Sequence, residues 1–254
     1  MGNHQEREIG FHLEQERFVT RRMVVKIGSS TITGNTENLD VNFMENIARQ
    51  VSLLFNQGIE VMIVTSGAVI SGKRGLGRVD TVLDKQVAAL YGQPELISEW
   101  RKTLNNNGVK KVGQLLVTDI DLRNVKTILS KSLHFGVVVV NANDPVNNYE
   151  MKQFLVSADN DRLAGFIAKE IDADTLLLLT DVDGVLDKSG KVINNFSTKE
   201  EIVIFSASSL GTGGMSSKIQ VAQEFIGRAI IANGRSENVL LKVARGEEVG
   251  TQFH

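Results

Sequence analysis

Short apolar runs alternate along the chain with segments whose apolar residues recur at helical spacing. Short runs that are apolar throughout are typical of parallel strands covered on both faces. The clearest helix begins after Asp40, which can cap its first turn, and ends at Gly58. The runs that predict strands span residues 23–27, 61–64, 115–118, 137–140 and 176–179.

This alternation predicts an α/β fold, a three-layer αβα sandwich with a mostly parallel central sheet. With 254 residues, of which 42% are hydrophobic, the chain can bury the core of one large domain. Residues 1–22 are polar and charged and contain no apolar stretch of signal-peptide length, so we expect a flexible N-terminal extension there. Residues 23–254 are then expected to form the domain.

The net charge and the lack of cysteine limit which kinds of partner and compartment the protein can be expected to have. A net charge of −2 gives no support for a nucleic-acid or membrane-surface partner, because binding to such surfaces depends on dense lysine and arginine. The lack of cysteine in the sequence excludes disulfides and thiolate chemistry, and it fits a reducing cytoplasm. We therefore expect a cytoplasmic protein with a small-molecule ligand, and we assign no metal ligands.

The glycine-rich segment 211–218 places small residues, hydroxyls and Lys218 where a helix is predicted to begin. Glycine lets backbone N–H groups approach an anion, and a helix N-terminus favours negative charge. The segment therefore fits a phosphate site, although a flexible turn before an ordinary amphipathic helix has the same pattern. The apolar residues that continue this helix are Ile219, Ala222, Phe225 and Ile226.

Lys26 interrupts the first apolar strand, which runs directly into the turn Gly28-Ser29-Ser30. Burying an ammonium group is costly unless an anion meets it. The side chain of Lys26 therefore either extends to solvent or faces a phosphate beyond the carboxyl end of its strand. In the second case Lys26 and Lys218 would form a pair of cations around one ligand.

Polar clusters follow several of the predicted strands. Ligands of open α/β sheets bind beyond the carboxyl ends of the strands, so these clusters are expected to meet at one edge. Each cluster taken singly also fits an ordinary turn, because Asn, Asp and Gly favour turns for local reasons. The clusters are Gly28-Ser29-Ser30, Ser66-Gly67, Asn141-Ala142-Asn143-Asp144 and Thr180-Asp181-Val182-Asp183-Gly184, with Asp159-Asn160-Asp161 opening a helix.

Taken together and in this order, these motifs resemble the amino acid kinase family, and most of all its branch that phosphorylates glutamate. The resemblance runs from about Met23 to Phe253, so it is far more specific than any one motif. No Walker A pattern is present in the sequence, and no His-Arg-Asp motif accompanies Asp181. Further motifs that carry the resemblance are Lys85-Gln86-Val87-Ala88-Ala89, Gly92-Gln93, Gln114-Leu115-Leu116 and Thr212-Gly213-Gly214-Met215 with Lys218.

The resemblance implies ATP-dependent phosphorylation of the γ-carboxylate of L-glutamate, the first step of proline biosynthesis, with Mg²⁺ bridging the phosphates. It implies that Lys26 and Lys218 flank the transferring phosphoryl group and that Asp161 organises both lysines. The residues implied in nucleotide binding are Lys26, Gly28, Ser29, Thr180, Asp181, Thr212, Gly213, Gly214, Met215, Ser216, Ser217 and Lys218. Those implied in glutamate binding are Ser66, Asn141, Asp144 and Asn160.

The chain departs from the glutamate-phosphorylating pattern at a few positions. Ala142 stands where that branch has glutamate, and the run after Gly184 is more similar to kinases of N-acetylglutamate. A kinase for a related carboxylate, of the N-acetylglutamate or aminoadipate type, and a catalytically silent sensor therefore stay open as alternatives. Many members of the branch add a C-terminal PUA domain, whereas the resemblance here covers the kinase domain alone. We also expect a homo-oligomer.

Overall fold

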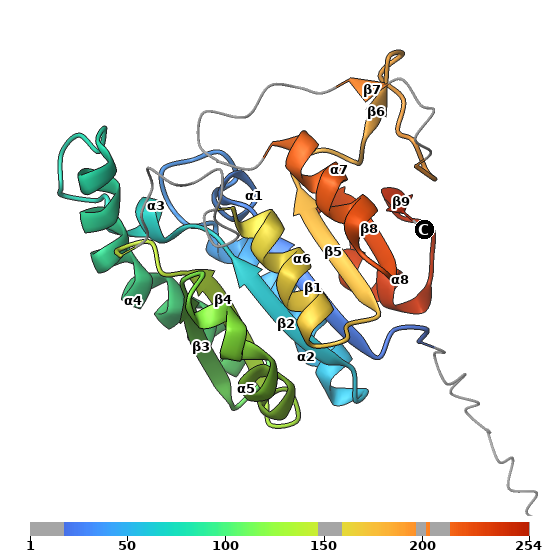
Figure 1. The fold of residues 1–254 in the computed structure, drawn as a ribbon, viewed down its shortest axis with the longest axis horizontal. Helices are drawn as coiled ribbons and strands as arrows, with labels where there is room; N and C mark the ends of the chain where they lie inside the picture. Colours follow the sequence, from blue (N-terminus) through green and yellow to red (C-terminus); the bar gives the residue numbers. More distant parts are fainter. Residues whose placement is uncertain (1–17, 147–158, 197–201, 204–213, 254) are drawn as a thin grey trace, which may run out of the picture.

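A computed structural model describes residues 18–146, 159–196, 202–203 and 214–253 (Figure 1). Its strands alternate with helices along most of the chain, as the apolar pattern predicted. The strands are β1 (Arg22–Ile27), β2 (Glu60–Thr65), β3 (Val112–Val117), β4 (Val137–Ala142), β5 (Thr175–Thr180), β6 (Leu186–Asp187), β7 (Ile202–Val203), β8 (Arg228–Asn233) and β9 (Thr251–Phe253). The helices are α1 (Ser29–Thr33), α2 (Val41–Asn56), α3 (Ala68–Gly72), α4 (Val82–Asn106), α5 (Val125–Ser132), α6 (Asn160–Glu170), α7 (Met215–Glu224) and α8 (Val239–Arg245), with a 3₁₀ turn at Asp121–Asn124.

Seven strands form the central sheet in the order β3-β4-β2-β1-β5-β8-β9. All neighbouring strands pair in parallel except β8 and β9, which are antiparallel. The strands β1 and β5 lie in the middle, and every residue of β5 is buried. The predicted mostly parallel sheet is therefore confirmed.

Helices cover both faces of the sheet and complete the three layers (Figure 1). On one face, α2, α4 and α8 bury Met44, Trp100 and Leu240 against the strands. On the other face, α5, α6 and α7 bury residues such as Leu129 and Ile167. Burial on both sides explains why the strands read as continuous apolar runs and not as alternating ones.

The predicted helix after Asp40 is confirmed as α2, and the Asp40 carboxylate accepts a hydrogen bond from the Phe43 N–H group at 3.0 Å. The extent predicted for α7 is wrong, because the helix ends at Glu224 and leaves Phe225 and Ile226 outside it. Phe225 is already extended, and the chain then turns through Gly227, with φ of +151°, to enter β8. Helical spacing alone could not reveal this turn.

The described residues just before β1 pack against the domain. Val19 N–H donates to the Ala244 carbonyl at 2.9 Å, and the hydroxyls of Thr20 and Thr175 lie 2.9 Å apart. Most of the predicted N-terminal extension, residues 1–17, lies outside the described residues. Among the helices that are described, none has the length and apolar character needed to cross a membrane.

The helices α3 and α4 touch through their backbones at two glycines. A Cβ on Gly72 would lie 1.9 Å from the Ala88 carbonyl oxygen, and one on Gly92 would lie 1.8 Å from that of Ala68. Real Cβ atoms cannot approach so closely, so a larger residue at either position would push the helices apart. This contact fixes α4 against α3, the helix that follows β2.

Candidate active site

The carboxyl ends of the parallel strands lie together toward the top of Figure 1, where α1 and α3 begin. The predicted polar clusters that follow β1, β2, β4 and β5 therefore share one edge of the sheet, as the parallel pairing requires. Residues 211–213 of the glycine-rich segment, which include Thr212 and Gly213, lie outside the described residues. The described members of the predicted set can be placed by their contacts.

A buried carboxylate joins the two predicted lysines. The Nζ atom of Lys26, on β1, lies 2.6 Å from Oδ1 of Asp161, and Nζ of Lys218, on α7, lies 3.0 Å from Oδ2 of the same side chain. Asp161 is fully buried, and the lysines are only 4% and 6% exposed. Lys26 therefore does not extend to solvent, so the first alternative for its side chain is wrong.

Burial and neighbouring charges shift the pKa values of two residues of this cluster, Lys26 and Asp161. Burial lowers the pKa of Lys26 below its ordinary value, and the nearby Asp161 carboxylate opposes that change only in part. Burial also acts to raise the pKa of Asp161, but the two ammonium groups outweigh it and hold this pKa below its ordinary value. With all three groups ionised, the cluster keeps an excess of one positive charge, which favours an anionic ligand.

Local structure at the start of α6 sets the position of Asp161. Asp159 is the N-cap, and its Oδ1 accepts a hydrogen bond from the Asp161 N–H group at 2.8 Å. Its other oxygen accepts a hydrogen bond from the hydroxyl of Ser217, on the first turn of α7. Two helix N-termini, those of α6 and α7, are thus tied together next to the carboxylate that joins the lysines.

Gly28 lies beside the Lys26 ammonium. A Cβ on Gly28 would lie 3.4 Å from Nζ of Lys26, an ordinary contact distance, so the backbone of this turn is a direct neighbour of the ammonium group. Ser29 begins α1 directly after it. The turn after β1 therefore presents backbone to the same space that the ammonium group faces.

A second cluster consists of neutral polar side chains at the ends of β2 and β4. The Nδ2 atom of Asn160 donates to Ser66 Oγ at 2.9 Å and to Asn141 Oδ1 at 3.2 Å. Within the described part of the chain, Asn141 Nδ2 and Asn160 Oδ1 are buried without a hydrogen-bond partner. Unpaired buried polar atoms are rare in proteins and call for a ligand or water. Asp144 follows β4 within the same segment.

The end of β5 forms the third part of the site. The Thr180 hydroxyl lies 3.3 Å from Oδ1 of Asp181, and Asn35 Nδ2 donates to the other carboxylate oxygen at 3.3 Å. Asn233, at the end of β8, donates to Asp183 at 2.9 Å. Neither contact was predicted. Asn233 was missed because β8 was not recognised, although residues 229–232 form an apolar run that could have revealed it.

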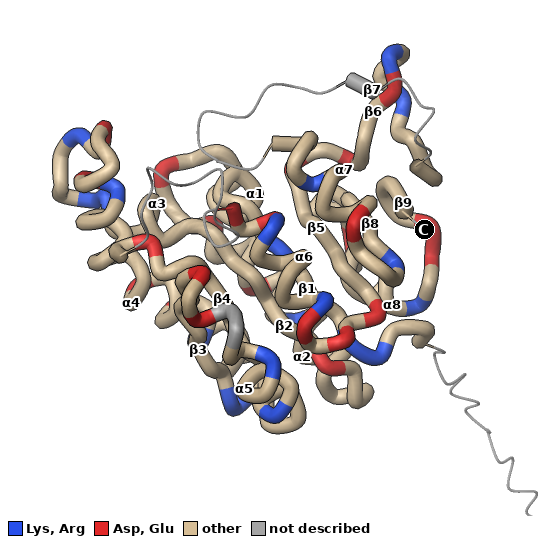
Figure 2. Tube along the Cα trace, viewed as in Figure 1, with Lys and Arg blue, Asp and Glu red and all other residues tan. Residues whose placement is uncertain are grey.

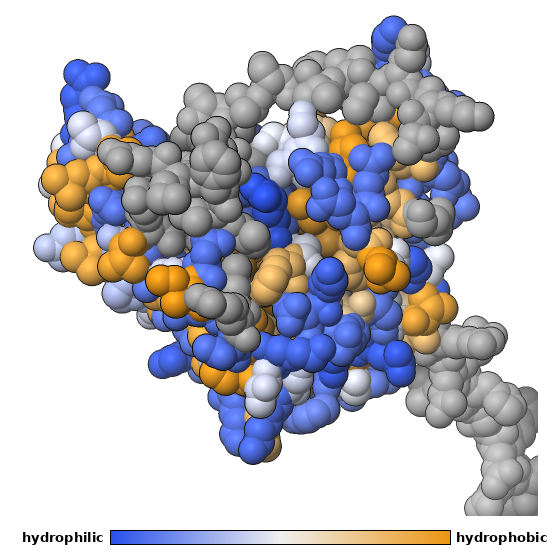
Figure 3. All heavy atoms as spheres, in the orientation of Figure 1, coloured by the Kyte–Doolittle hydropathy of each residue, from blue (hydrophilic) through white to orange (hydrophobic). Residues whose placement is uncertain are grey.

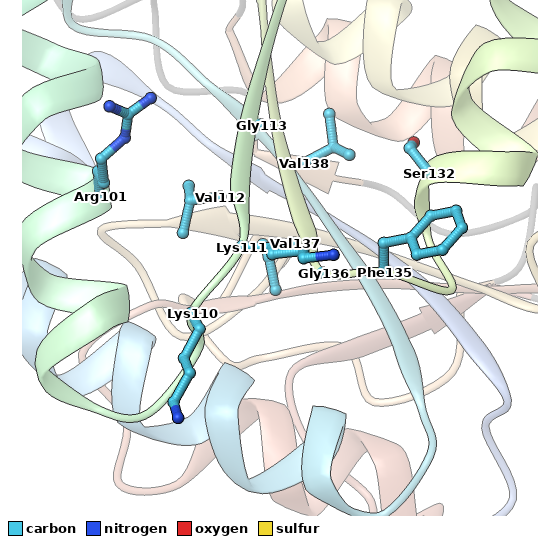
Figure 4. Close-up of a pocket in the computed structure, with 10 residues that line it drawn as sticks. All are labelled: Arg101, Lys110, Lys111, Val112, Gly113, Ser132, Phe135, Gly136, Val137 and Val138. Carbon is cyan, nitrogen blue, oxygen red and sulfur yellow. The ribbon is translucent and has the colours of Figure 1, made fainter.

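A separate hollow of about 480 Å³ opens at the amino ends of β3 and β4, the edge of the sheet away from these clusters (Figure 4). Arg101 and Lys110 point away from each other there, and Lys111 extends toward Phe135, its Nζ 5.4 Å from the ring centroid. Because its charged groups diverge, this hollow does not concentrate charge on one ligand. It shares no residue with the predicted site.

Along the described chain, lysine and arginine are interspersed with aspartate and glutamate (Figure 2). The positive charge that matters for ligand binding is therefore local, in the cluster of Lys26, Asp161 and Lys218. Two buried ammonium groups at the carboxyl edge of a parallel sheet, beside two helix N-termini, are typical of a protein that binds phosphate groups.

The comparison with known families agrees with this class of site. The model of the amino acid kinase family matches residues 21–233, and the chain belongs to that family. The relatives to which it is similar include the glutamate 5-kinase of Thermoanaerobacter sp. (strain X514), 38% identical over 91% of this chain and 67% of the relative. The glutamate 5-kinase of Methanosarcina mazei is 36% identical over 94% of this chain and 70% of the relative.

Among solved structures, UMP kinase from Bacillus anthracis has the same fold, with a TM-score of 0.62. It is 18% identical and covers 92% of this chain and 96% of its own, so it bears on the fold alone. The prediction of the amino acid kinase family, in its glutamate-phosphorylating branch, is confirmed by the family match and the glutamate 5-kinases. The prediction of a three-layer αβα fold is confirmed as well.

Proposed function

We propose that this chain transfers the γ-phosphoryl group of ATP to the γ-carboxylate of L-glutamate, giving L-glutamyl 5-phosphate and ADP, the first step of proline biosynthesis. Membership of a kinase family implies ATP as the donor, and the relatives named glutamate 5-kinase support the acceptor. The observation that carries the proposal is the buried cluster of Lys26, Asp161 and Lys218.

The chemistry of the reaction explains why such a cluster is useful. A carboxylate oxygen attacks the γ-phosphorus, the bond from that phosphorus to the bridging oxygen breaks, and ADP leaves with the bond electrons. Several negative groups must approach one another, so catalysis depends on charge neutralisation and alignment. We propose that Lys26 and Lys218 neutralise the transferring group from two sides, while Asp161 holds both ammoniums in place and accepts no proton.

The nucleotide is proposed to bind along β5 and α7. Gly28 and Ser29 would offer backbone N–H groups to the phosphates, and Thr180 and Asp181 would contact the remainder of the nucleotide. Segment 212–218 would wrap the phosphates from the start of α7. Here Met215, Ser216 and Ser217 form the first turn of the helix.

Mg²⁺ is proposed to enter with ATP. Magnesium binds one or two carboxylates together with substrate phosphates, and Asp159 fits this requirement. Its carboxylate is close enough to influence the pKa of Lys26, and it keeps free lone pairs beside its two hydrogen bonds. The ion would neutralise part of the phosphate charge.

The amino-acid acceptor is proposed to bind at Ser66, Asn141, Asp144 and Asn160. The buried, unpaired Asn141 Nδ2 and Asn160 Oδ1 supply one donor and one acceptor there, which suits a ligand that carries both a carboxylate and an ammonium group. The Asp144 carboxylate would add charge for the ammonium. A kinase acting on N-acetylglutamate or aminoadipate uses the same phosphoryl chemistry, so the acceptor is the part to be tested.

We predict that the purified chain, given MgATP and L-glutamate, releases ADP and forms an acyl phosphate that hydroxylamine traps as a hydroxamate. The physical reason is the excess positive charge beside two neutral amides, which suits a carboxylate next to a triphosphate. Parallel reactions with N-acetylglutamate and aminoadipate serve as comparisons. Product from one of these but not from glutamate would replace the proposed acceptor, and no ADP release with any of them would indicate a silent sensor.

We further propose that the chain is a cytoplasmic homo-oligomer that associates through α4. Leu83, Val87, Leu90 and Tyr91 repeat along one face of this helix and are between 37% and 67% exposed. In Figure 3 apolar side chains gather at the left of the view, where Figure 1 places α4. A single apolar stripe along a helix is self-complementary about a two-fold axis, so a second copy is the occupant that fits it.

Replacing Leu83 and Leu90 together by glutamate is predicted to convert the oligomer to monomers, because charges would face each other across the two-fold axis. Light scattering after size exclusion measures the mass directly. Ile226→Glu, at a 92% exposed residue outside α4, is the matched control and should leave the mass unchanged. A monomeric wild type, or an oligomer that survives the double substitution, would exclude this interface.

A further inference from the structure

We propose that Gln93 is a positioning residue that holds the acceptor-binding segment at the end of β4 and thereby sets the affinity for the amino-acid acceptor. Gln93 lies on α4 and is only 4% exposed. Its Nε2 donates to the carbonyl oxygen of Ala142, the last residue of β4, at 3.1 Å. The inference rests on the proposed function, because it concerns the acceptor half of the same site.

The Ala142 residue is held from both sides of its backbone. Its carbonyl accepts from Gln93, and its N–H group donates to Oδ1 of Asn141 at 2.8 Å. That same oxygen accepts from Asn160. The hydrogen bond of Gln93 is therefore the outermost link of a chain that runs through Asn141 to the cluster of neutral side chains. Asp144 lies two residues further along the chain, so its position depends on how the backbone of Ala142 is held.

The helix α4 is itself anchored to the end of β2. The indole N–H of Trp100, which is fully buried, donates to the Thr65 hydroxyl at 3.2 Å. Thr65 immediately precedes Ser66, a member of the cluster of neutral side chains. Together with the backbone contact at Gly92, this bond fixes the axial position of α4. One helix thus sets the ends of β2 and β4 relative to each other.

Gln93 has one further atom without a partner. Among the described residues, its Oε1 is buried and accepts no hydrogen bond. A buried glutamine with half of its amide unpaired lowers the free energy of unfolding, because leucine would fill about the same volume without an unpaired polar atom. This cost is consistent with a role in ligand binding. Lys26, Asp161 and Lys218 pair with one another on β1, α6 and α7, whereas Gln93 donates to β4, so the nucleotide half of the site should not depend on it.

The test is Gln93→Leu, which preserves volume and removes the amide. We expect the KM for L-glutamate to rise about tenfold, kcat to stay within about threefold, and the KM for ATP to stay unchanged, since one buried hydrogen bond is lost and a carbonyl is left unsatisfied. Gln93→Met, which is more flexible and closer in shape, should give the same split. If the leucine variant fails to fold, the KM values of the methionine variant test the positioning role.

Gln50→Leu is the matched control. Gln50 is also fully buried and hydrogen-bonds backbone of another element, accepting from the Leu240 N–H group at 2.9 Å on the α8 side of α2. We expect both leucine variants to lower the melting temperature, but only the variant at Gln93 to change the KM for the acceptor. A merely structural role would make the two variants behave alike.

The two proposals fail in different ways. If wild type phosphorylates N-acetylglutamate and not glutamate, the proposed acceptor is wrong, and the KM split is then measured with N-acetylglutamate. An unchanged acceptor KM in both Gln93 variants, or equal increases in the KM values for acceptor and ATP, would overturn the positioning role. Neither of these two results with the Gln93 variants would change the activity assigned to the wild-type chain.

Discussion

Lys218→Met is expected to lower kcat for phosphoryl transfer by about 10²-fold or more, while the KM for the acceptor changes little. The variant keeps the length of the side chain and removes a buried charge that lies 3.0 Å from Asp161. A preorganised charge acts most strongly where negative charge shifts during the reaction, so its loss appears in kcat. Lys26→Met should give a loss of the same order. Initial rates over a matrix of ATP and glutamate concentrations measure both constants.

Lys102→Met provides the control for these two variants. Lys102 lies on α4, pairs with Glu99 at 3.5 Å, and has a side chain that is 65% exposed. Exposed ion pairs contribute little to stability, and its replacement should leave both kcat and KM unchanged. A kcat close to that of wild type in Lys218→Met or Lys26→Met would assign that lysine to the structure and not to the chemistry.

Asp161→Asn is expected to reduce both activity and stability. The substitution keeps the shape of the side chain but leaves two buried ammonium groups without a counter-charge, a change that typically destabilises a protein by about 3–5 kcal/mol. The rate should fall by about 10²-fold because the lysines lose their fixed positions. Urea unfolding at pH 7 measures the first effect, and steady-state kinetics at low urea measures the second.

The pH dependence separates the charge of Asp161 from its shape. Folding lowers the pKa of Asp161, so the ionised carboxylate contributes stability that is present above its unfolded pKa. This contribution is lost as the pH falls through the folded pKa, that is, below about pH 4. The stability gap between wild type and Asp161→Asn should therefore be widest near neutral pH and narrow in acid. A gap that is constant down to pH 3 would show that packing, and not charge, explains the effect.

Much of the fold could be predicted because it depends on local pattern. A strand covered on both faces must be apolar throughout, and such runs identified five of the strands in the central sheet. Asp40 predicted the start of α2, since an unpaired N–H group at a helix end needs an acceptor. The end of α7 was predicted wrongly, and the strand β8 was not predicted. Helical spacing continues through Phe225 whether or not the backbone turns at Gly227.

The candidate site likewise contains residues that could be predicted from the sequence and contacts that could not. Lys26 and Lys218 stood out because a lysine within an apolar strand, or after a glycine-rich turn, needs a physical reason. Gln93 belongs to the Gly92-Gln93 motif that carries the family resemblance, but its hydrogen bond to β4 could not be predicted, because a glutamine in a long helix has many possible partners. Its role becomes apparent only from its hydrogen bond to the Ala142 carbonyl, which joins α4 to β4.

Short segments of the sequence were enough to predict the α/β class, the polar residues that follow the strands, and the two lysines of the proposed phosphate site. These properties depend on what each short segment can bury, cap or leave charged. The fold of the whole chain was needed to show that Asp161 lies between Lys26 and Lys218, and that α4 contacts both β2 and β4. Strand order and helix position fix those contacts, and both arise from packing between segments far apart in the chain, which no local period records.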